Sequence, residues 1–196
     1  MKEKNIDTPM LAPVKEACEV LKSGGVILYP TDTVWGLGCD ATNREAVEKI
    51  FAIKKRPESK SLIILVKDLD MLARYIREIP EIAISLVEIS DTPLTIIYPG
   101  AVSLAPNVIS SDGTVAVRIP DHPFVSALLS RFNHPLVSTS ANIAQAQPPA
   151  RFAEIDPAII SSADWVANSR FEEGATGKPS SIIKLGLRGE VEIIRK

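Results

Sequence analysis

The sequence has only two cysteines, two histidines and few aromatic residues, and each scarcity excludes a class of protein. Cys18 and Cys39 form no CxxC pair, so we expect neither a disulfide framework nor a zinc site and interpret both as small core residues. His122 and His134 stand alone before prolines, and we assign neither a role. With 5% aromatic residues and a net charge of −2, the chain lacks the signature of a general nucleic-acid binder.

Long apolar runs are also missing. The longest are far shorter than a membrane span, and the first ten residues, MKEKNIDTPM, have no apolar core of a secretory signal. We therefore expect a soluble, cytoplasmic protein that does not enter a membrane. A length of 196 residues with 45% hydrophobic content predicts one well-cored domain, residues 1–196, without repeats or linkers.

The most informative stretch runs from residue 24 to residue 67. Residues 26–29 are apolar β-formers stopped by Pro30, which predicts a strand covered on both faces. The hydroxyls and glycines of residues 31–38 follow directly, at the position where α/β proteins place ligand crevices. Asn43 can cap the next helix, which must end near Arg56 because Pro57 follows.

A cationic cluster, Lys54, Lys55, Arg56 and Lys60, lies at the end of that helix. Two interpretations remain open from the cluster alone. The cations can complement the helix dipole as ordinary surface residues, which is the commoner case, or they can collect phosphate groups.

Two further segments carry polar groups at the ends of predicted strands. Arg118 lies in the otherwise apolar strand 114–119, either facing water from an edge strand or serving as a pocket cation for a carboxylate. Residues 138–142, Ser-Thr-Ser-Ala-Asn, follow a short strand at 136–137 and form either a capped turn or a second ligand crevice.

The remaining periodicity predicts an α/β protein of the α+β type, with about seven strands in a mixed sheet and about five packed helices. The other predicted helices are 13–23, 68–76, 80–89, 123–132 and a short one at 156–160; the other predicted strands are 61–66, 94–98, 165–167, 181–185 and 190–195.

The ordered set of PTDTVWGLG, then Lys54-x-Arg56, then Lys60, then Ser138 to Asn142 resembles the YrdC family of threonylcarbamoyl-AMP synthases. The resemblance extends from about Val14 to Arg195. It implies a twisted, open mixed sheet around a cationic cavity. It also implies joining L-threonine, bicarbonate and ATP into threonylcarbamoyl-AMP and pyrophosphate, for threonylcarbamoyladenosine at position 37 of tRNAs. Transient handover of the product to tRNA-modification proteins or tRNA would follow.

The resemblance also implies residue roles. Lys54 and Arg56 would be catalytic and bind ATP phosphates, and magnesium would arrive with ATP rather than in a protein cage of its own. Asp32, the nearest carboxylate, is expected to serve the turn, and Trp35 is expected to form a pocket wall. The full expected set is Lys54, Arg56, Lys60, Thr114, Ser140, Asn142 and Arg195 for ATP, and Thr33, Arg118, Ser138 and Ser180 for threonine.

Two positions depart from the family pattern. Pro148 stands where many members have a serine against ATP, and Leu65 stands where some have a histidine against threonine. Two rival functions remain in view: an RNA-binding module without catalysis, and a carbamoyl-transfer role of the kind found in hydrogenase maturation. Neither is favoured, because the chain lacks basic–aromatic patterning and the extra regions of the maturation proteins.

Overall fold

The computed structural model describes residues 8–55, 62–144 and 146–196, and its strands form one mixed sheet in the order β7-β1-β2-β6-β3-β5-β4-β8-β9. β1–β7, β3–β5 and β4–β8 are parallel pairs, and the other pairs are antiparallel. The predicted α/β class with a mixed sheet is confirmed. The strands are β1 (Ile27–Tyr29), β2 (Gly36–Gly38), β3 (Ile63–Leu65), β4 (Leu94–Tyr98), β5 (Val115–Arg118), β6 (Leu136–Ser140), β7 (Trp165–Val166), β8 (Ser181–Leu185) and β9 (Val191–Arg195).

The helices agree closely with their predicted positions. Asn43 caps α2, accepting a hydrogen bond from the Ala46 amide at 3.1 Å, and Lys55 ends that helix in the left-handed region with φ of 50°. α1 begins five residues before its predicted start. The prediction placed Pro13 in the first turn, where proline is best tolerated, but the helix continues on the N-terminal side of Pro13. The helices are α1 (Thr8–Lys22), α2 (Arg44–Lys54), α3 (Leu69–Leu72), α4 (Glu81–Ile89), α5 (Pro123–Phe132) and α6 (Pro157–Ser162), with 3-10 turns η1 (Phe152–Glu154) and η2 (Ser169–Glu172).

The sequence predicts about seven strands because β2 reads as a turn. Its Gly-Leu-Gly sequence carries no β-branched residue, yet it pairs with both β1 and β6. A Cβ at Gly38 would lie 2.6 Å from Tyr29 Cε1 and 2.7 Å from the Val137 carbonyl oxygen, so only glycine lets the backbones approach this closely. β6 is also longer than predicted, since Ser138 to Ser140 belong to the strand rather than to a turn after it.

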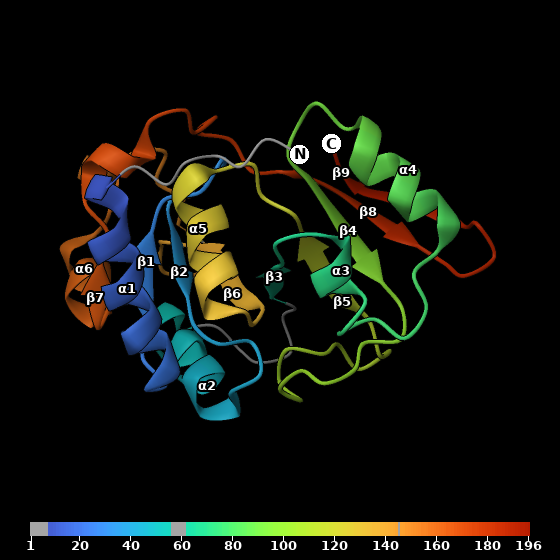
Figure 1. Cartoon of the computed structure of the whole chain (residues 1–196), viewed down its shortest axis with the longest axis horizontal. Coiled ribbons are helices and arrows are strands. Elements are labelled where there is room, and N and C mark those ends of the chain that lie inside the picture. The colour runs from blue at the N-terminus through green and yellow to red at the C-terminus, as the bar shows by residue number, and fades with distance from the viewer. Residues whose placement is uncertain (1–7, 56–61, 145) are drawn as a thin grey trace.

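The two faces of the sheet are used differently. α1 and α5 pack against each other and lie in front of β1 and β2 (Figure 1). β1 is fully buried, as predicted for a strand covered on both faces. On β5, Val115 and Val117 face the core, whereas Ala116 and Arg118 face a cavity on the opposite side, which is the period of two expected of a strand.

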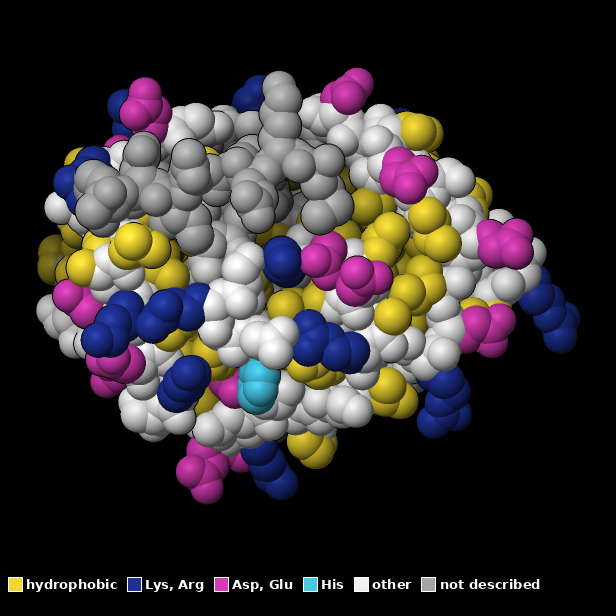
Figure 2. Space-filling view, viewed as in Figure 1, with side chains coloured by type: hydrophobic (Ala, Val, Ile, Leu, Met, Phe, Trp, Pro, Cys, Tyr) yellow, Lys and Arg dark blue, Asp and Glu magenta, His cyan; other side chains and the backbone are white. Residues whose placement is uncertain are grey.

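The surface is uneven. On the face shown in Figure 2, apolar side chains gather on the half that carries α4, where Ile89 is 71% exposed, and cations are interspersed with carboxylates on the other half. Among the described residues, no helix combines the length and apolar character needed to cross a membrane.

Candidate functional site

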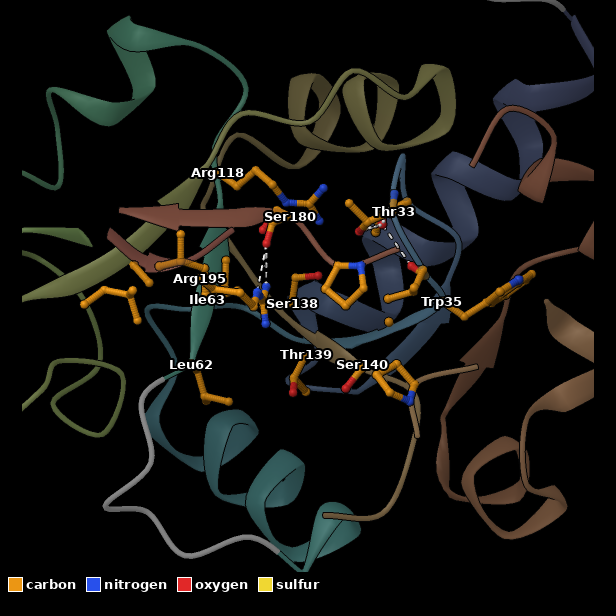
Figure 3. Close-up of a pocket in the computed structure, with 18 of the residues that line it drawn as sticks. Thr33, Trp35, Leu62, Ile63, Arg118, Ser138, Thr139, Ser140, Ser180 and Arg195 are labelled. Carbon is orange, nitrogen blue, oxygen red and sulfur yellow. Dashed lines mark hydrogen bonds between the residues drawn. The ribbon is translucent and has the colours of Figure 1, made fainter. Parts of the chain in front are cut away.

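A cavity of about 280 Å³ lies where the ends of several strands meet, and Figure 3 shows the side chains that point into it. It brings together predicted site residues from segments that are far apart in the sequence. Its apolar walls include Trp35, Leu62, Ile63, Ile97 and Ile182. Its polar lining consists of Thr31, Thr33, Arg118, Ser138, Thr139, Ser140, Ser180 and Arg195.

The turn after β1 presents hydroxyl groups with a defined orientation. Thr31 Oγ1 donates to the Val34 carbonyl at 2.9 Å and accepts from the Thr33 amide at 3.1 Å. Thr31 Oγ1 and Thr33 Oγ1 lie 2.8 Å apart. Because a hydroxyl has one hydrogen and that of Thr31 is committed to Val34, the Thr33 hydroxyl donates to Thr31. Thr33 therefore offers only acceptor lone pairs to a ligand in the cavity.

Arg118 is a buried pocket cation, so the edge-strand interpretation is wrong. β5 lies between β3 and β4, and Arg118 is 5% exposed. Its Nη1 donates to Asp32 Oδ1, which holds the guanidinium in place. Its Nε is buried and makes no hydrogen bond within the described part of the chain. The nearest carboxylate thus serves the arginine, a partnership that no local sequence pattern reveals.

A second arginine approaches the same cavity from β9. Arg195 donates from Nε and Nη2 to the Ser180 carbonyl, at 2.9 and 2.8 Å, and Ser180 Oγ lies 2.7 Å from Thr95 Oγ1. Partial burial, and then the charge of Arg118, lower the pKa of Arg195. Two guanidinium groups therefore act on one small volume, opposite Thr33 in Figure 3.

Trp35 is a pocket wall, as predicted, and two residues that the sequence analysis missed position it. Its Nε1 donates to Glu172 Oε2 at 2.6 Å, and the same oxygen accepts from the Phe152 amide at 2.8 Å. The Trp35 and Phe152 rings pack 5.0 Å apart between centroids. The polar anchor of Trp35 lies 137 residues away, so periodicity could not indicate it.

Lys54 and Asn142 do not line the cavity; they join α2 to the segment after β6. Lys54 is 2% exposed, and its Nζ donates to the carbonyls of Ser140 and, at 2.7 Å, Asn142. The Asn142 side chain donates to the Ile143 carbonyl at 3.1 Å. The Lys54 carbonyl accepts from the Ala144 amide at 2.9 Å. In this structure the two residues fix the shape of the loop beside Ser140.

Thr114 lies in a neighbouring cavity of about 800 Å³, which shares Ile97, Ala116 and Ile194 with the first. Thr114 Oγ1 donates to Asp112 Oδ1 at 2.7 Å, and Lys184 donates to Asp112 Oδ2 at 2.8 Å. These hydrogen bonds, that of Lys184 first, lower the pKa of Asp112 to about 2. The two cavities are therefore neighbours that share three lining residues.

The other residues singled out in the sequence differ in where the structure places them. Arg56 and Lys60 lie outside the described residues. Pro148 lines the cavity at the position where a serine was expected, and Leu65 is buried in β3 without lining it. His122 and His134 lie outside both cavity linings. Among the described residues, no group of three or more His, Cys, Asp or Glu side chains is placed to hold a metal ion.

The donor set indicates the chemistry. Two guanidinium groups and a row of hydroxyls fit an anionic ligand with polar substituents, and the apolar walls exclude water. The cavity holds no nucleophile–base pair among its described residues, so its contribution is positioning and electrostatic stabilisation. The two carboxylates that contact lining residues are engaged within the chain, Asp32 by Arg118 and Glu172 by Trp35 and the Phe152 amide.

Comparisons with known proteins show which proteins the chain is similar to. The family model Sua5_yciO_yrdC, described as telomere recombination, matches residues 19–196. A protein of Halorhodospira halophila, a threonylcarbamoyl-AMP synthase, is 39% identical over 143 residues, covering 72% of this chain and 75% of its own. The Stenotrophomonas maltophilia threonylcarbamoyl-AMP synthase is 36% identical over 186 residues, covering 93% and 94%.

One solved structure that is similar to this chain contains a bound ligand. The crystal structure of P. abyssi Sua5 complexed with L-threonine matches with a TM-score of 0.80 and 29% identity over 88% of this chain. This chain spans half the length of that Sua5 chain, covering 50% of it.

Proposed function

This chain belongs to the Sua5/YciO/YrdC family, and from that premise we propose that it is a threonylcarbamoyl-AMP synthase, a nucleotidyltransferase of tRNA modification. It joins L-threonine, bicarbonate and ATP into L-threonylcarbamoyl-AMP and pyrophosphate. The observation that carries the proposal is the convergence of Thr33, Arg118, Ser138 and Ser180 on one cavity. These are the residues that the family resemblance assigns to threonine.

The threonine end is built around Arg118. Its guanidinium, fixed by Asp32 and with Nε still buried and without a hydrogen bond among the described residues, is suited to the substrate carboxylate. Thr33 accepts a hydrogen from the amine or the hydroxyl of the substrate. Ser138 and Ser180 supply further hydroxyls, and a cavity of about 280 Å³ limits the ligand at this end to a small molecule.

The nucleotide end extends from Ser140 and Arg195 toward Thr114 in the neighbouring cavity. Arg56 and Lys60 complete our proposed phosphate-binding set, together with Lys54 and Asn142. Lys54 and Asn142 hold the loop beside Ser140 in this structure, so their ATP contacts require this loop to rearrange when the nucleotide binds. Magnesium bound with ATP would neutralise phosphate charge, and the chain's own residues orient the reactants.

The chemistry needs two bonds to form. The threonine amine and bicarbonate give a carbamate with loss of water. A carbamate oxygen then bonds to the α-phosphorus of ATP as the bond to pyrophosphate breaks. Both reactants of the second step are anionic, so cations that suppress their repulsion and hold them in line supply most of the catalysis, with Lys54 and Arg56 the proposed catalytic residues.

Three further proposals follow from this function. ATP, threonine and tRNA are cytoplasmic, so we place the protein in the cytoplasm. We also propose that residues 1–196 form one domain; in the described part of the chain, a single sheet joins strands from both halves. The product passes to tRNA-modification proteins or tRNA in a transient encounter.

The test is a turnover assay. The protein is incubated with ATP, bicarbonate and magnesium, with and without L-threonine, and pyrophosphate and the adenylate are followed by mass. We expect threonine-dependent release of both, reduced at least tenfold in Ser138→Ala. The matched control is Ser126→Ala, the same change on α5 away from the cavity. Salt-sensitive tRNA binding without threonine-dependent pyrophosphate would overturn the proposal in favour of an RNA-binding module.

A further inference from the structure

The cavity contains cations but no anion. Among the described residues that line it, two are arginines and none is an aspartate or glutamate. Two carboxylates contact lining residues from outside: Asp32 pairs with Arg118 and lines a different cavity, and Glu172 accepts from Trp35. A substrate ammonium group in this space would meet Arg195, for which no carboxylate partner occurs among the described residues, and Arg118, whose charge is balanced by Asp32.

The other charged and titratable groups packed around the cavity do not line it, and two of them, Asp32 and Glu172, are carboxylates. Burial lowers the pKa of His122, which favours its neutral form, and burial raises the pKa of Tyr29. Glu172 accepts hydrogen bonds from the Trp35 ring and the Phe152 amide. Lys54 adds a further cation beyond Ser140. The charged and titratable side chains considered around the cavity, with the elements that carry them, are Tyr29 (β1), Asp32 (turn after β1), Lys54 (α2), Arg118 (β5), His122 (before α5), Glu172 (η2) and Arg195 (β9).

The cavity does offer uncharged acceptors. The Thr33 oxygen presents lone pairs because its hydrogen is given to Thr31. Such an oxygen can accept an N–H from an amine without requiring a positive charge on it. Burial first, and then the charge of Arg118, lower the pKa of Arg195, and the same two causes would lower the pKa of an amine bound in this space.

We propose, as a deepening of the synthase function and resting on it, that the cavity binds L-threonine with its amine unprotonated, so that binding expels the proton that carboxylation requires to be removed. The step balances: the ammonium form in solution becomes R–NH₂ in the cavity and one proton goes to the buffer. The freed lone pair then forms the N–C bond with bicarbonate, with loss of water. The protein needs no general base for this, because desolvation and like charge do the work.

The test is titration calorimetry of L-threonine, without nucleotide because ATP phosphates would oppose the effect. Heats are compared at one pH in buffers of different ionisation enthalpy, which gives the protons released per ligand bound. We expect close to one proton at pH 7 and an affinity that rises about tenfold per pH unit between pH 6 and 8. The control ligand is 2,3-dihydroxybutanoate, whose hydroxyl replaces the amine; it should release no proton and bind with a flat pH profile.

Variants sharpen the result. Thr139→Asp places a carboxylate in the lining and should abolish proton release, whereas Thr139→Asn should keep it; Lys49→Gln, a remote exposed cation, should behave as wild type. Threonine binding without proton release in the wild type overturns this inference and leaves the synthase proposal standing. If L-threonine does not bind at all, both proposals fail. The wild-type proton count decides the matter even if Thr139→Asp does not fold.

Discussion

Thr33 and Arg195 face the same cavity, yet they come from parts of the molecule that are held very differently. Thr33 follows β1, which is fully buried, pairs with strands on both sides and lies behind α1. Arg195 ends β9, an edge strand whose residues are all exposed; Ile193 is 61% exposed. One wall is part of the core, and the other is a hairpin attached to it through β4.

The difference in burial between the two walls indicates a difference in their roles. Side chains on the buried wall have fixed orientations, because displacing them would break the core as well as the site. The exposed hairpin has few buried contacts, and such segments open at low free-energy cost. We infer that the buried wall selects the small substrate and that the hairpin adapts to the larger one. The following predictions test that contrast, from the largest expected effect to the smallest.

Replacing Arg118 with methionine should mainly lower stability, whereas the same change at Arg195, described below, should mainly affect function. Arg118→Met leaves Asp32 buried without its cation, and breaking such a buried pair costs about 3–5 kcal/mol of unfolding free energy. Urea denaturation measures this loss. The double variant Asp32→Asn with Arg118→Met should recover much of it, since no uncompensated charge remains. Equal instability of the single and double variants would show that the charge is not the cause.

Gly38→Ala tests whether the buried wall tolerates any change of volume. Its Cβ would meet the Tyr29 ring at 2.6 Å and the Val137 carbonyl at 2.7 Å, so we expect a loss of about 2–3 kcal/mol of unfolding free energy. Gly36→Ala, in the same strand, is the comparison, because its Cβ would lie 3.3 Å from its nearest neighbours and should cost less. If both alanines cost the same, the close approach at Gly38 is not what requires glycine.

Arg195→Met should leave stability nearly unchanged and weaken nucleotide use. The side chain lies on an edge strand and, among the described residues, donates to the Ser180 carbonyl alone, so unfolding free energy should change by less than about 0.5 kcal/mol. Loss of a charged hydrogen bond to a phosphate should raise KM for ATP about tenfold or more. Steady-state pyrophosphate release measures it. A rise in KM for threonine alone would place Arg195 at the other end of the site.

For the buried wall, the sequence predicted most strands and helices but not the tertiary contacts between them. Apolar runs and caps such as Asn43 predicted most strands and helices, because local chemistry decides them. β2 was missed because its glycines matter only once Tyr29 and Val137 lie beside it. The partners of Arg118 and Trp35 were missed for the same reason. Asp32 reaches Arg118 and Glu172 reaches Trp35 only through the tertiary fold, which no local pattern encodes.

The family resemblance supplied the set of site residues, and the structure supplied their grouping. Thr33, Arg118, Ser138 and Ser180 meet at one cavity, Thr114 belongs to the next, and Lys54 with Asn142 braces a loop. A linear motif cannot distinguish a residue that touches a ligand from one that shapes the backbone beside it. Their roles toward ATP remain predictions.

The smallest expected effect concerns the contact that ties the exposed hairpin to the loop before β5. Lys184 on β8 donates to Asp112, and the folded-state pKa of Asp112, about 2, is below its ordinary value of 3.8. The contact therefore stabilises the protein above about pH 4 and is lost as the pH falls toward 2. Asp112→Asn should lower the Tm only slightly at pH 6, since the pair is exposed and screened, and by less at pH 2.5, where part of the stabilisation has been lost. Thermal scans at both pH values measure this, with the exposed Glu173→Gln as control. A deficit in Tm as large at pH 2.5 as at pH 6 would mean that Asp112 acts through the hydrogen bonds of Thr114 rather than through the charge of Lys184.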